Sequence, residues 1–139
     1  MARIEIDMPK QFLFITEYPV LATDINAANH MGMDRFLTVV IESQMRLFRH
    51  LGFEGGKIDE GVGYITVDTG INYLGEVRYG DLLDISVTAT EFGNKNFDLV
   101  YLFEVNDKKV ALIKTGILCF DYEQGKPVPV PESFKARFQ

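Results

Sequence analysis

The hydrophobic positions of the chain follow one helical period and several strand-like runs. Residues 12–22 are rich in aromatic and β-branched side chains and predict a strand, in which Pro19 indicates a sheet edge or a bulge. Between residues 33 and 51, apolar residues recur at helical spacing and predict one long helix that ends at Gly52. We expect the apolar half of this helix to be buried, with these residues on it: Phe36, Leu37, Val40, Ile41, Met45, Leu47, Phe48 and Leu51. The other half carries Thr38, Glu42, Ser43, Arg46 and Arg49, with Val39 as the apolar exception.

Four further strand-like runs follow the helix. They span residues 61–73, 81–92, 97–105 and 110–122. Residues 93–96 and 106–109 are hairpin signals that join the last three runs. The tail after residue 125 is expected to be extended, with Phe134 and Phe138 packing back on the body.

This order of elements predicts an α+β fold. A helix with so apolar a face must be buried, so we expect a curved antiparallel sheet of about five strands wrapped around one long central helix. Such a sheet leaves edges exposed, and pairing of edges between subunits predicts at least a dimer.

A polar segment, residues 24–34, separates the first strand from the helix. It reads Asp-Ile-Asn-Ala-Ala-Asn-His-Met-Gly-Met-Asp and includes the first of two histidines. Buried polar groups without partners cost a few kcal/mol each. The segment is therefore either a helix cap that satisfies its own polar groups or a functional site.

Composition narrows the class of protein. The 139 residues are expected to form a single domain, 1–139, and the net charge of -6 argues against nucleic acid or an anionic membrane as the main partner. No apolar stretch has membrane-spanning length, the N-terminus lacks the apolar core of a signal peptide, and Cys119 has no second cysteine to pair with. These features predict a cytoplasmic protein. No metal-ligand spacing, phosphate-binding glycine loop or serine nucleophile elbow is present, so neither a metal nor a cofactor is expected.

The order of elements and the polar segment resemble the hotdog fold of the 4-hydroxybenzoyl-CoA thioesterase-like superfamily. The resemblance covers nearly the whole chain and rests on residues 18–20, 23–26, His30, 36–37, 42–46, Tyr73, 80–81, 114–116 and 120–122. Within the superfamily, the chain resembles a group of bacterial thioesterase-like proteins with the pattern D-I-N-x-x-x-H-x-G-N-D. In this chain, Met33 stands where that pattern has Asn.

The resemblance implies hydrolysis of an acyl thioester, usually an acyl-CoA, at a site shared between two subunits. In many members an Asp of this loop is the nucleophile or general base, and N–H groups at the start of the helix polarise the thioester carbonyl. A helix N-terminus suits that task, because it offers unsatisfied donors and a partial positive charge. Each such donor is worth roughly 3–4 kcal/mol in acyl-transfer enzymes.

The chain departs from the common Asp-x-Asp version of the loop at Asn26, which matches the position of the catalytic Asp. An amide cannot act as a carboxylate base, although it can orient a water or the carbonyl. If the protein is active, His30 would activate water, with Asp24 or Asp34 orienting it. This combination resembles plant acyl-carrier-protein thioesterases, whose helix glutamate would correspond to Glu42.

Each candidate also has a structural interpretation. Asp24 and Asn26 could be turn residues, and His30 a neighbour of the helix cap that bonds a carbonyl. Asp34 could be a first-turn carboxylate favoured by the helix dipole, and Glu42 the partner of Arg46 in a solvated ion pair. The other positions of interest are expected as follows: Gly32 and Met33 at the substrate, His50 at the helix end, Cys119 in the core, and Lys57, Arg78, Lys95 and Lys114 as candidate cations for the CoA phosphates.

Two functions remain open at this point. The first is a thioesterase for a small or medium acyl group carried on CoA or acyl carrier protein, active as a homodimer or a dimer of dimers. The second is a non-catalytic hotdog module that binds an acyl-CoA-like ligand. Dehydratase chemistry on the same fold is the weaker third, because no second histidine lies near an aspartate with the spacing of that group.

Overall fold

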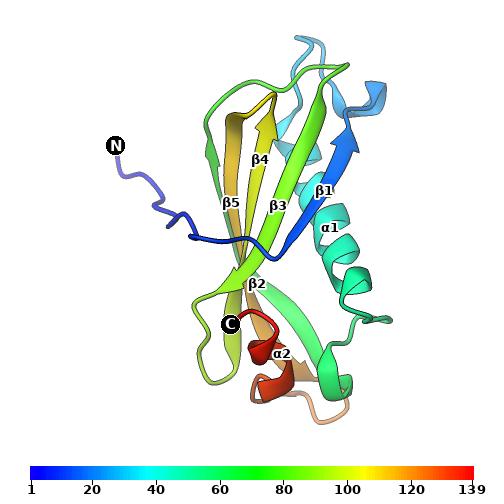
Figure 1. The fold of residues 1–139 in the computed structure, drawn as a ribbon, viewed down its shortest axis with the longest axis vertical. Coiled ribbons are helices and arrows are strands. Elements are labelled where there is room, and N and C mark those ends of the chain that lie inside the picture. Colours follow the sequence, from blue (N-terminus) through cyan, green and yellow to red (C-terminus); the bar gives the residue numbers. More distant parts are fainter.

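The computed structural model describes all 139 residues. An antiparallel sheet curls around the helix α1 (Met33–His50), which confirms the predicted α+β fold (Figure 1). The strands are β1 (Phe14–Pro19), β2 (Gly63–Tyr73), β3 (Leu82–Thr90), β4 (Asn96–Val105), β5 (Lys108–Asp121) and the two-residue β6 (Lys126–Pro127). The short helices are η1 (Ala22–Asp24), η2 (Asp59–Gly61) and α2 (Glu132–Ala136).

The strands lie in the order β1-β3-β4-β5-β2, so β1 and β2 form the two edges of the sheet. The two predicted hairpins join β3 to β4 and β4 to β5. Asn106 and Asp107 both have positive φ, at 50° and 65°, as a tight two-residue turn requires. Pro19 lies on the edge strand β1, where its missing N–H costs no ladder hydrogen bond. The chain must cross one end of the sheet between β2 and β3, because these consecutive strands are not neighbours.

The expected orientation of α1 is wrong in part. Leu37, Ile41 and Met45 are exposed, at 41%, 63% and 53% of their surface, whereas Val39 and Ser43 are buried. Ser43 tolerates burial because its hydroxyl donates to the Val39 carbonyl oxygen at 2.7 Å. Half of the residues of α1 are apolar and they spread around more than half of the helical wheel, so the period alone fits more than one orientation.

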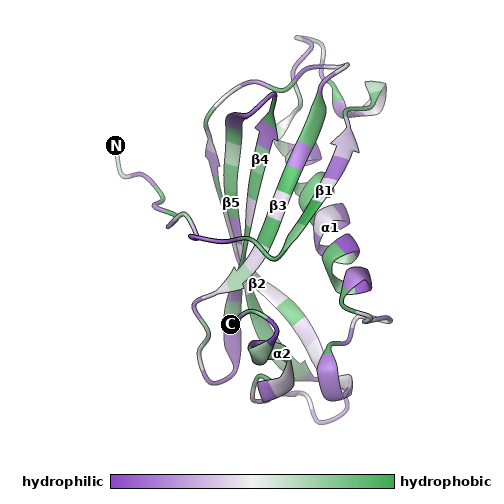
Figure 2. Ribbon diagram, viewed as in Figure 1, coloured by the Kyte–Doolittle hydropathy of each residue, from purple (hydrophilic) through white to green (hydrophobic).

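The core lies between α1 and the inner face of the sheet, and hydrophobic positions run along the central strands (Figure 2). Cys119 belongs to this core, as expected, and burial raises the pKa of its thiol to about 11. Phe134 is fully buried 4.9 Å from the Phe97 ring, which confirms that the tail packs back, although it does so from the helical turn α2. None of the helices combines the length and the apolar character needed to span a lipid bilayer.

Candidate active site

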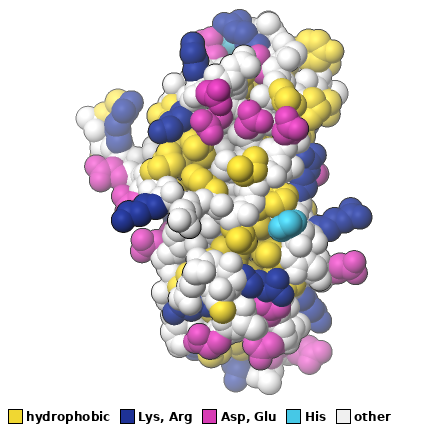
Figure 3. Space-filling model, viewed as in Figure 1, with side chains coloured by type: hydrophobic (Ala, Val, Ile, Leu, Met, Phe, Trp, Pro, Cys, Tyr) yellow, Lys and Arg dark blue, Asp and Glu magenta, His cyan; other side chains and the backbone are white.

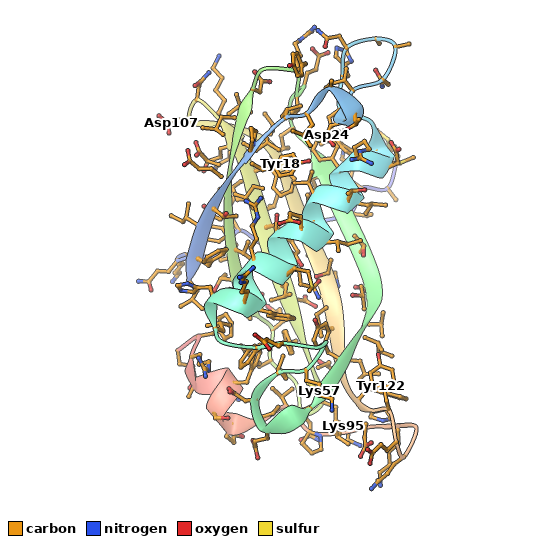
Figure 4. All side chains as sticks on the ribbon, turned by 90° about the vertical axis from the view of Figure 1, so that its right-hand side faces the viewer. Tyr18, Asp24, Lys57, Lys95, Asp107 and Tyr122 are labelled. Carbon is orange, nitrogen blue, oxygen red and sulfur yellow. The ribbon has the colours of Figure 1, made fainter.

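Asp24 is the buried anchor of the polar segment. Its carboxylate is fully buried and accepts four hydrogen bonds: from the Tyr18 hydroxyl at 2.9 Å, from the Leu21 N–H at 2.9 Å, and from Arg35 at 2.9 and 3.1 Å. Hydrogen bonds to Asp24 raise the pKa of Arg35, and the pKa of Tyr18 is raised by burial and then by its bond to Asp24. The group thus ties β1, η1 and the first turn of α1 together, near one end of the molecule (Figure 4).

Asn26 organises the exposed part of the segment. Its Oδ1 accepts the N–H groups of Ala28 at 3.0 Å and His30 at 3.2 Å. Its own N–H donates to the His30 carbonyl oxygen at 2.9 Å, and its carbonyl oxygen accepts the Asn29 N–H at 3.0 Å. The loop therefore closes on itself, and the Asn26 Nδ2 group has no partner within the chain.

His30 lies beside a carboxylate that comes from a distant part of the chain. The Met31 N–H donates to the Val77 carbonyl oxygen at 2.8 Å, which joins the loop to the β2–β3 crossover. This contact places the Glu76 carboxylate 3.4 Å from the His30 Nε2, and Arg78 holds the same carboxylate at 2.6 Å. The His30 side chain remains 36% exposed.

The start of α1 offers donors without acceptors. The N-cap is Gly32, which has no side chain to bond the first turn. The first N–H groups with an acceptor are those of Arg35 and Phe36, which both donate to the Gly32 carbonyl oxygen. The N–H groups of Met33 and Asp34 donate to no group of the chain, whereas the Gly32 N–H faces the Asp24 carbonyl oxygen across the bridge between Ile25 and Met31. The start of a long helix is therefore open to an external oxygen.

Asp34 and Gly32 lie against each other at this helix start. A Cβ on Gly32 would lie 2.6 Å from the Asp34 Oδ1, so a side chain there would displace the carboxylate. Asp34 is exposed in the first turn, where the helix dipole favours its charge. Met33 is 70% exposed beside it. These three residues form the rim around the free N–H groups.

Glu42 lies away from the loop. It follows Asp34 by eight residues, or about 12 Å along the helix axis. Its carboxylate pairs with Arg46 at 2.7 Å, the ion pair that the spacing predicted. Arg46 also donates to the Thr16 hydroxyl and to the Glu17 carbonyl oxygen, so the pair links α1 to the edge strand β1.

The candidate cations for CoA are spread over the molecule. Arg78 pairs with Glu76, and Lys114 pairs with Asp68 and Asp98. Lys57 and Lys95 lie at the end opposite Asp24 and Tyr18 (Figure 4). Lys57 lines a groove of about 520 Å³ between the second half of α1, the following loop and the start of β2. The groove is also lined by Met45, Phe48, Phe53, Tyr64, Glu42, Arg46, Arg49, Glu54 and Gly55.

Sequence reasoning missed three contributors to this region. Tyr18 and Arg35 hold Asp24 from six residues before it and eleven residues after it. Glu76 contacts His30 although α1 and β2 lie between the two residues in the sequence. No local pattern marks Glu76, because its position depends on the crossover between two strands that are not neighbours.

Comparisons with known proteins agree with this architecture. The family model of the thioesterase-like superfamily matches residues 20–138. A curated relative, the L-carnitine dehydrogenase/betainyl-CoA thioesterase of Rhizobium meliloti (strain 1021), is 25% identical over 126 residues. That match covers 84% of this chain and 25% of the relative, so the chain spans about a quarter of the relative's length.

Solved structures share the fold at low identity. A 1,4-dihydroxy-2-naphthoyl-CoA thioesterase from Synechocystis superposes with a TM-score of 0.78 at 18% identity, covering 90% of this chain and 94% of that one. A thioesterase from Thermus thermophilus, solved with coenzyme A and zinc, also gives 0.78, at 20% identity, covering 93% and 99%. The match of the family model over most of the chain establishes that this protein belongs to the thioesterase-like superfamily.

Proposed function

We propose that the protein is an acyl-CoA thioesterase whose active site is the polar segment together with the start of α1. The observation that carries the proposal is the pair of free N–H groups on Met33 and Asp34, which open beside the loop of His30. Attack on a thioester carbonyl places negative charge on its oxygen. Preorganised backbone donors stabilise that charge better than they stabilise the ground state.

His30 supplies the base in this mechanism. A water attacks the thioester carbon while the imidazole accepts its proton, and the resulting oxyanion is held by the N–H groups of α1. The intermediate collapses with cleavage of the C–S bond, and the imidazolium returns the proton to the departing thiolate. In this mechanism the Glu76 carboxylate, 3.4 Å from Nε2, orients the ring, and Nδ1 is the nitrogen that accepts the proton of the water.

The other candidates take supporting roles. Asp24 is a positioning residue, because all of its hydrogen bonds go to groups that fix the loop and none to His30. Asn26 presents its free Nδ2 to the water or the carbonyl. Asp34 and Met33 border the reacting group, and Glu42 acts through the placement of α1 rather than in the chemistry.

We further propose that the active form is a homodimer paired through β2. One side of β2 pairs with β5 and the other is a free edge, along which Val67 is 58% exposed. This long edge carries no proline or lysine to discourage pairing. The exposed side of α1 adds an apolar stripe, with side chains four residues apart: Met33, Leu37, Ile41 and Met45.

Such pairing supports a site shared between subunits. In an antiparallel pair related by a two-fold axis, the start of one β2 lies beside the end of the other. Tyr73 at the end of β2 packs 5.2 Å from Phe36, one turn into α1, whereas Tyr64 at its start lines the 520 Å³ groove. The groove of the second copy would therefore approach the loop of the first.

The substrate we propose is a small or medium acyl group on CoA, in a cytoplasmic setting. The curated relative is named for betainyl-CoA, a small acyl thioester, which makes betainyl-CoA the first compound to test. Acyl carrier protein is the second carrier to compare.

The alternative is a module that binds an acyl-CoA-like ligand without cleaving it. One observation favours it: Asn26 occupies the position of the common catalytic carboxylate, and its Oδ1 is engaged by two backbone N–H groups. The free donors of α1 would then bind the thioester carbonyl without a base to activate water.

The deciding experiment is a thiol-release assay on a panel of aliphatic and aromatic acyl-CoAs, including betainyl-CoA, with His30→Ala as the comparison. Turnover that the variant loses supports the thioesterase. Absence of turnover on CoA and carrier-protein substrates, combined with a thermal shift on binding a non-hydrolysable acyl-CoA analogue, supports the binding module. Full activity of His30→Ala would exclude the proposed base.

A further inference from the structure

The N-terminal arm, residues 1–12, crosses the outer face of the sheet, opposite α1 (Figure 1). Ile6 and Phe12 pack there against a small hydrophobic cluster of Val100, Leu102 and Leu112. These cluster residues alternate along β4 and β5 with the core residues that face α1, as side chains on opposite faces of a sheet must. The arm is therefore anchored on the body from its middle onwards.

The beginning of the arm has few partners within the chain. Apolar and charged residues alternate strictly from Arg3 to Met8, the pattern of a half-buried strand, yet no strand forms. The backbone of the whole arm makes one hydrogen bond to the rest of the chain, from the Asn72 side chain to the Ile4 carbonyl oxygen at 2.8 Å. Met1 is fully exposed and Ile4 is 58% exposed.

The N-terminal end of the arm lies at the free edge of β2. Ile4 lies so close to this strand that a Cβ on Gly70 would be 3.2 Å from its Cγ2. An open hollow of about 800 Å³ separates the first seven residues from residues 71–74, where Tyr73 and Leu74 are 50% and 53% exposed. Hydrophobic side chains gather on the face where the arm leaves the body (Figure 3).

We propose that the N-terminal arm clasps a second copy of this chain across the β2 edge. The inference rests on the homodimer of the proposed function, and it assigns the arm a contact of its own. A strand paired to the free edge of β2 would run beside the hollow, where it covers Met1 and Ile4 and offers partners to the arm backbone. Two-fold symmetry presents both arms to the opposite subunits, so each dimer gains the contact twice.

Sedimentation equilibrium of the full chain tests the clasp. Ile4→Asp and deletion of residues 2–8 are expected to raise the dimer Kd at least tenfold. Ile15→Asp is the matched control, since Ile15 is 68% exposed on β1 at the opposite edge of the sheet. It should leave the Kd within twofold. Circular dichroism and thermal unfolding of the monomers verify that each variant folds.

A crosslinking experiment locates the contact directly. Ile4→Cys, labelled with a benzophenone maleimide and irradiated, should give a covalent dimer, while Ile15→Cys treated alike should not. Cys119 is fully buried and can stay in place. An unchanged Kd in both arm variants, adducts confined to one chain, or a wild-type protein that stays monomeric would each overturn the clasp. Thiol release measured on the same samples separates the two ideas, because a clasped dimer without turnover contradicts the thioesterase and leaves the clasp standing.

Discussion

The two halves of the polar segment use their side chains in opposite ways. Asp24 is fully buried, and each of its hydrogen bonds is to a group of the surrounding fold. Asn26 and His30 are held mainly by backbone bonds, which leaves the Asn26 Nδ2 and much of the imidazole accessible. A carboxylate that already accepts several hydrogen bonds is a poor base, whereas an imidazole that stays partly exposed can accept a proton. In the proposed mechanism, Asp24 therefore has a structural role and His30 a chemical one within the same short segment.

The largest expected effect is on stability, at Asp24. Asp24→Ala leaves the Arg35 charge and the Tyr18 hydroxyl without their acceptor, and we expect unfolding free energy to fall by about 3–5 kcal/mol. Urea unfolding measures it. In a double-mutant cycle with Arg35→Ala, the combined loss should be well below the sum of the single losses. Additive losses would contradict the coupling and weaken the view of Asp24 as an anchor.

The next effect is on activity, at His30. His30→Ala should lower kcat about 100-fold or more, the usual contribution of a general base, while unfolding free energy changes by less than about 0.5 kcal/mol. Steady-state thiol release and urea unfolding provide the two numbers. His50→Ala is the control, because His50 is exposed at the far end of α1 against Phe14. An equal fall in kcat in both histidine variants would contradict the role of His30 as the base.

A smaller effect is expected from the paired changes at Asn26. Asn26→Ala removes the acceptor of two backbone N–H groups and should cost about 1 kcal/mol of stability. Asn26→Asp keeps that acceptor and should restore the stability. Turnover unchanged in Asn26→Asp supports a mechanism centred on His30. A large gain in turnover would instead indicate that a carboxylate at this position takes over as base.

The smallest effect is expected at Glu42. Glu42→Gln breaks the half-exposed ion pair with Arg46, which is worth about 0.2–1 kcal/mol, and should leave kcat unchanged. Thermal unfolding and the same thiol-release assay check both statements. A fall in kcat as large as that of His30→Ala would place Glu42 in the chemistry and contradict the supporting role proposed for it.

Local sequence signals predicted the elements because their causes are local. Gly52 has φ of +88° just after α1, and the turn at Asn106 and Asp107 takes the positive φ values that asparagine and aspartate tolerate. The ion pair between Glu42 and Arg46 follows from helical spacing alone. The free donors at the start of α1 also follow from local chemistry, since glycine at the N-cap cannot bond them.

Long-range contacts were beyond the reach of these signals. The strand order could not be derived, because β3 and β4 separate β2 from its partner β5 in the sequence, and no turn motif specifies that pairing. The buried face of α1 was ambiguous, since apolar residues spread around more than half of the helical wheel and only packing decided that Val39 and Ser43 turn inward. The meeting of Glu76 with His30 depends on the same crossover.

The sequence by itself determined the long helix, the main strands, the hairpins and the composition of the loop that resembles thioesterases, because each depends on neighbours within a few residues. Only the tertiary structure decided which polar groups of that loop are hydrogen-bonded within the fold and which stay free to bind a ligand. That division arises because burial and hydrogen-bond saturation are set by residues brought in from elsewhere: Arg35 for Asp24, and Glu76 for His30.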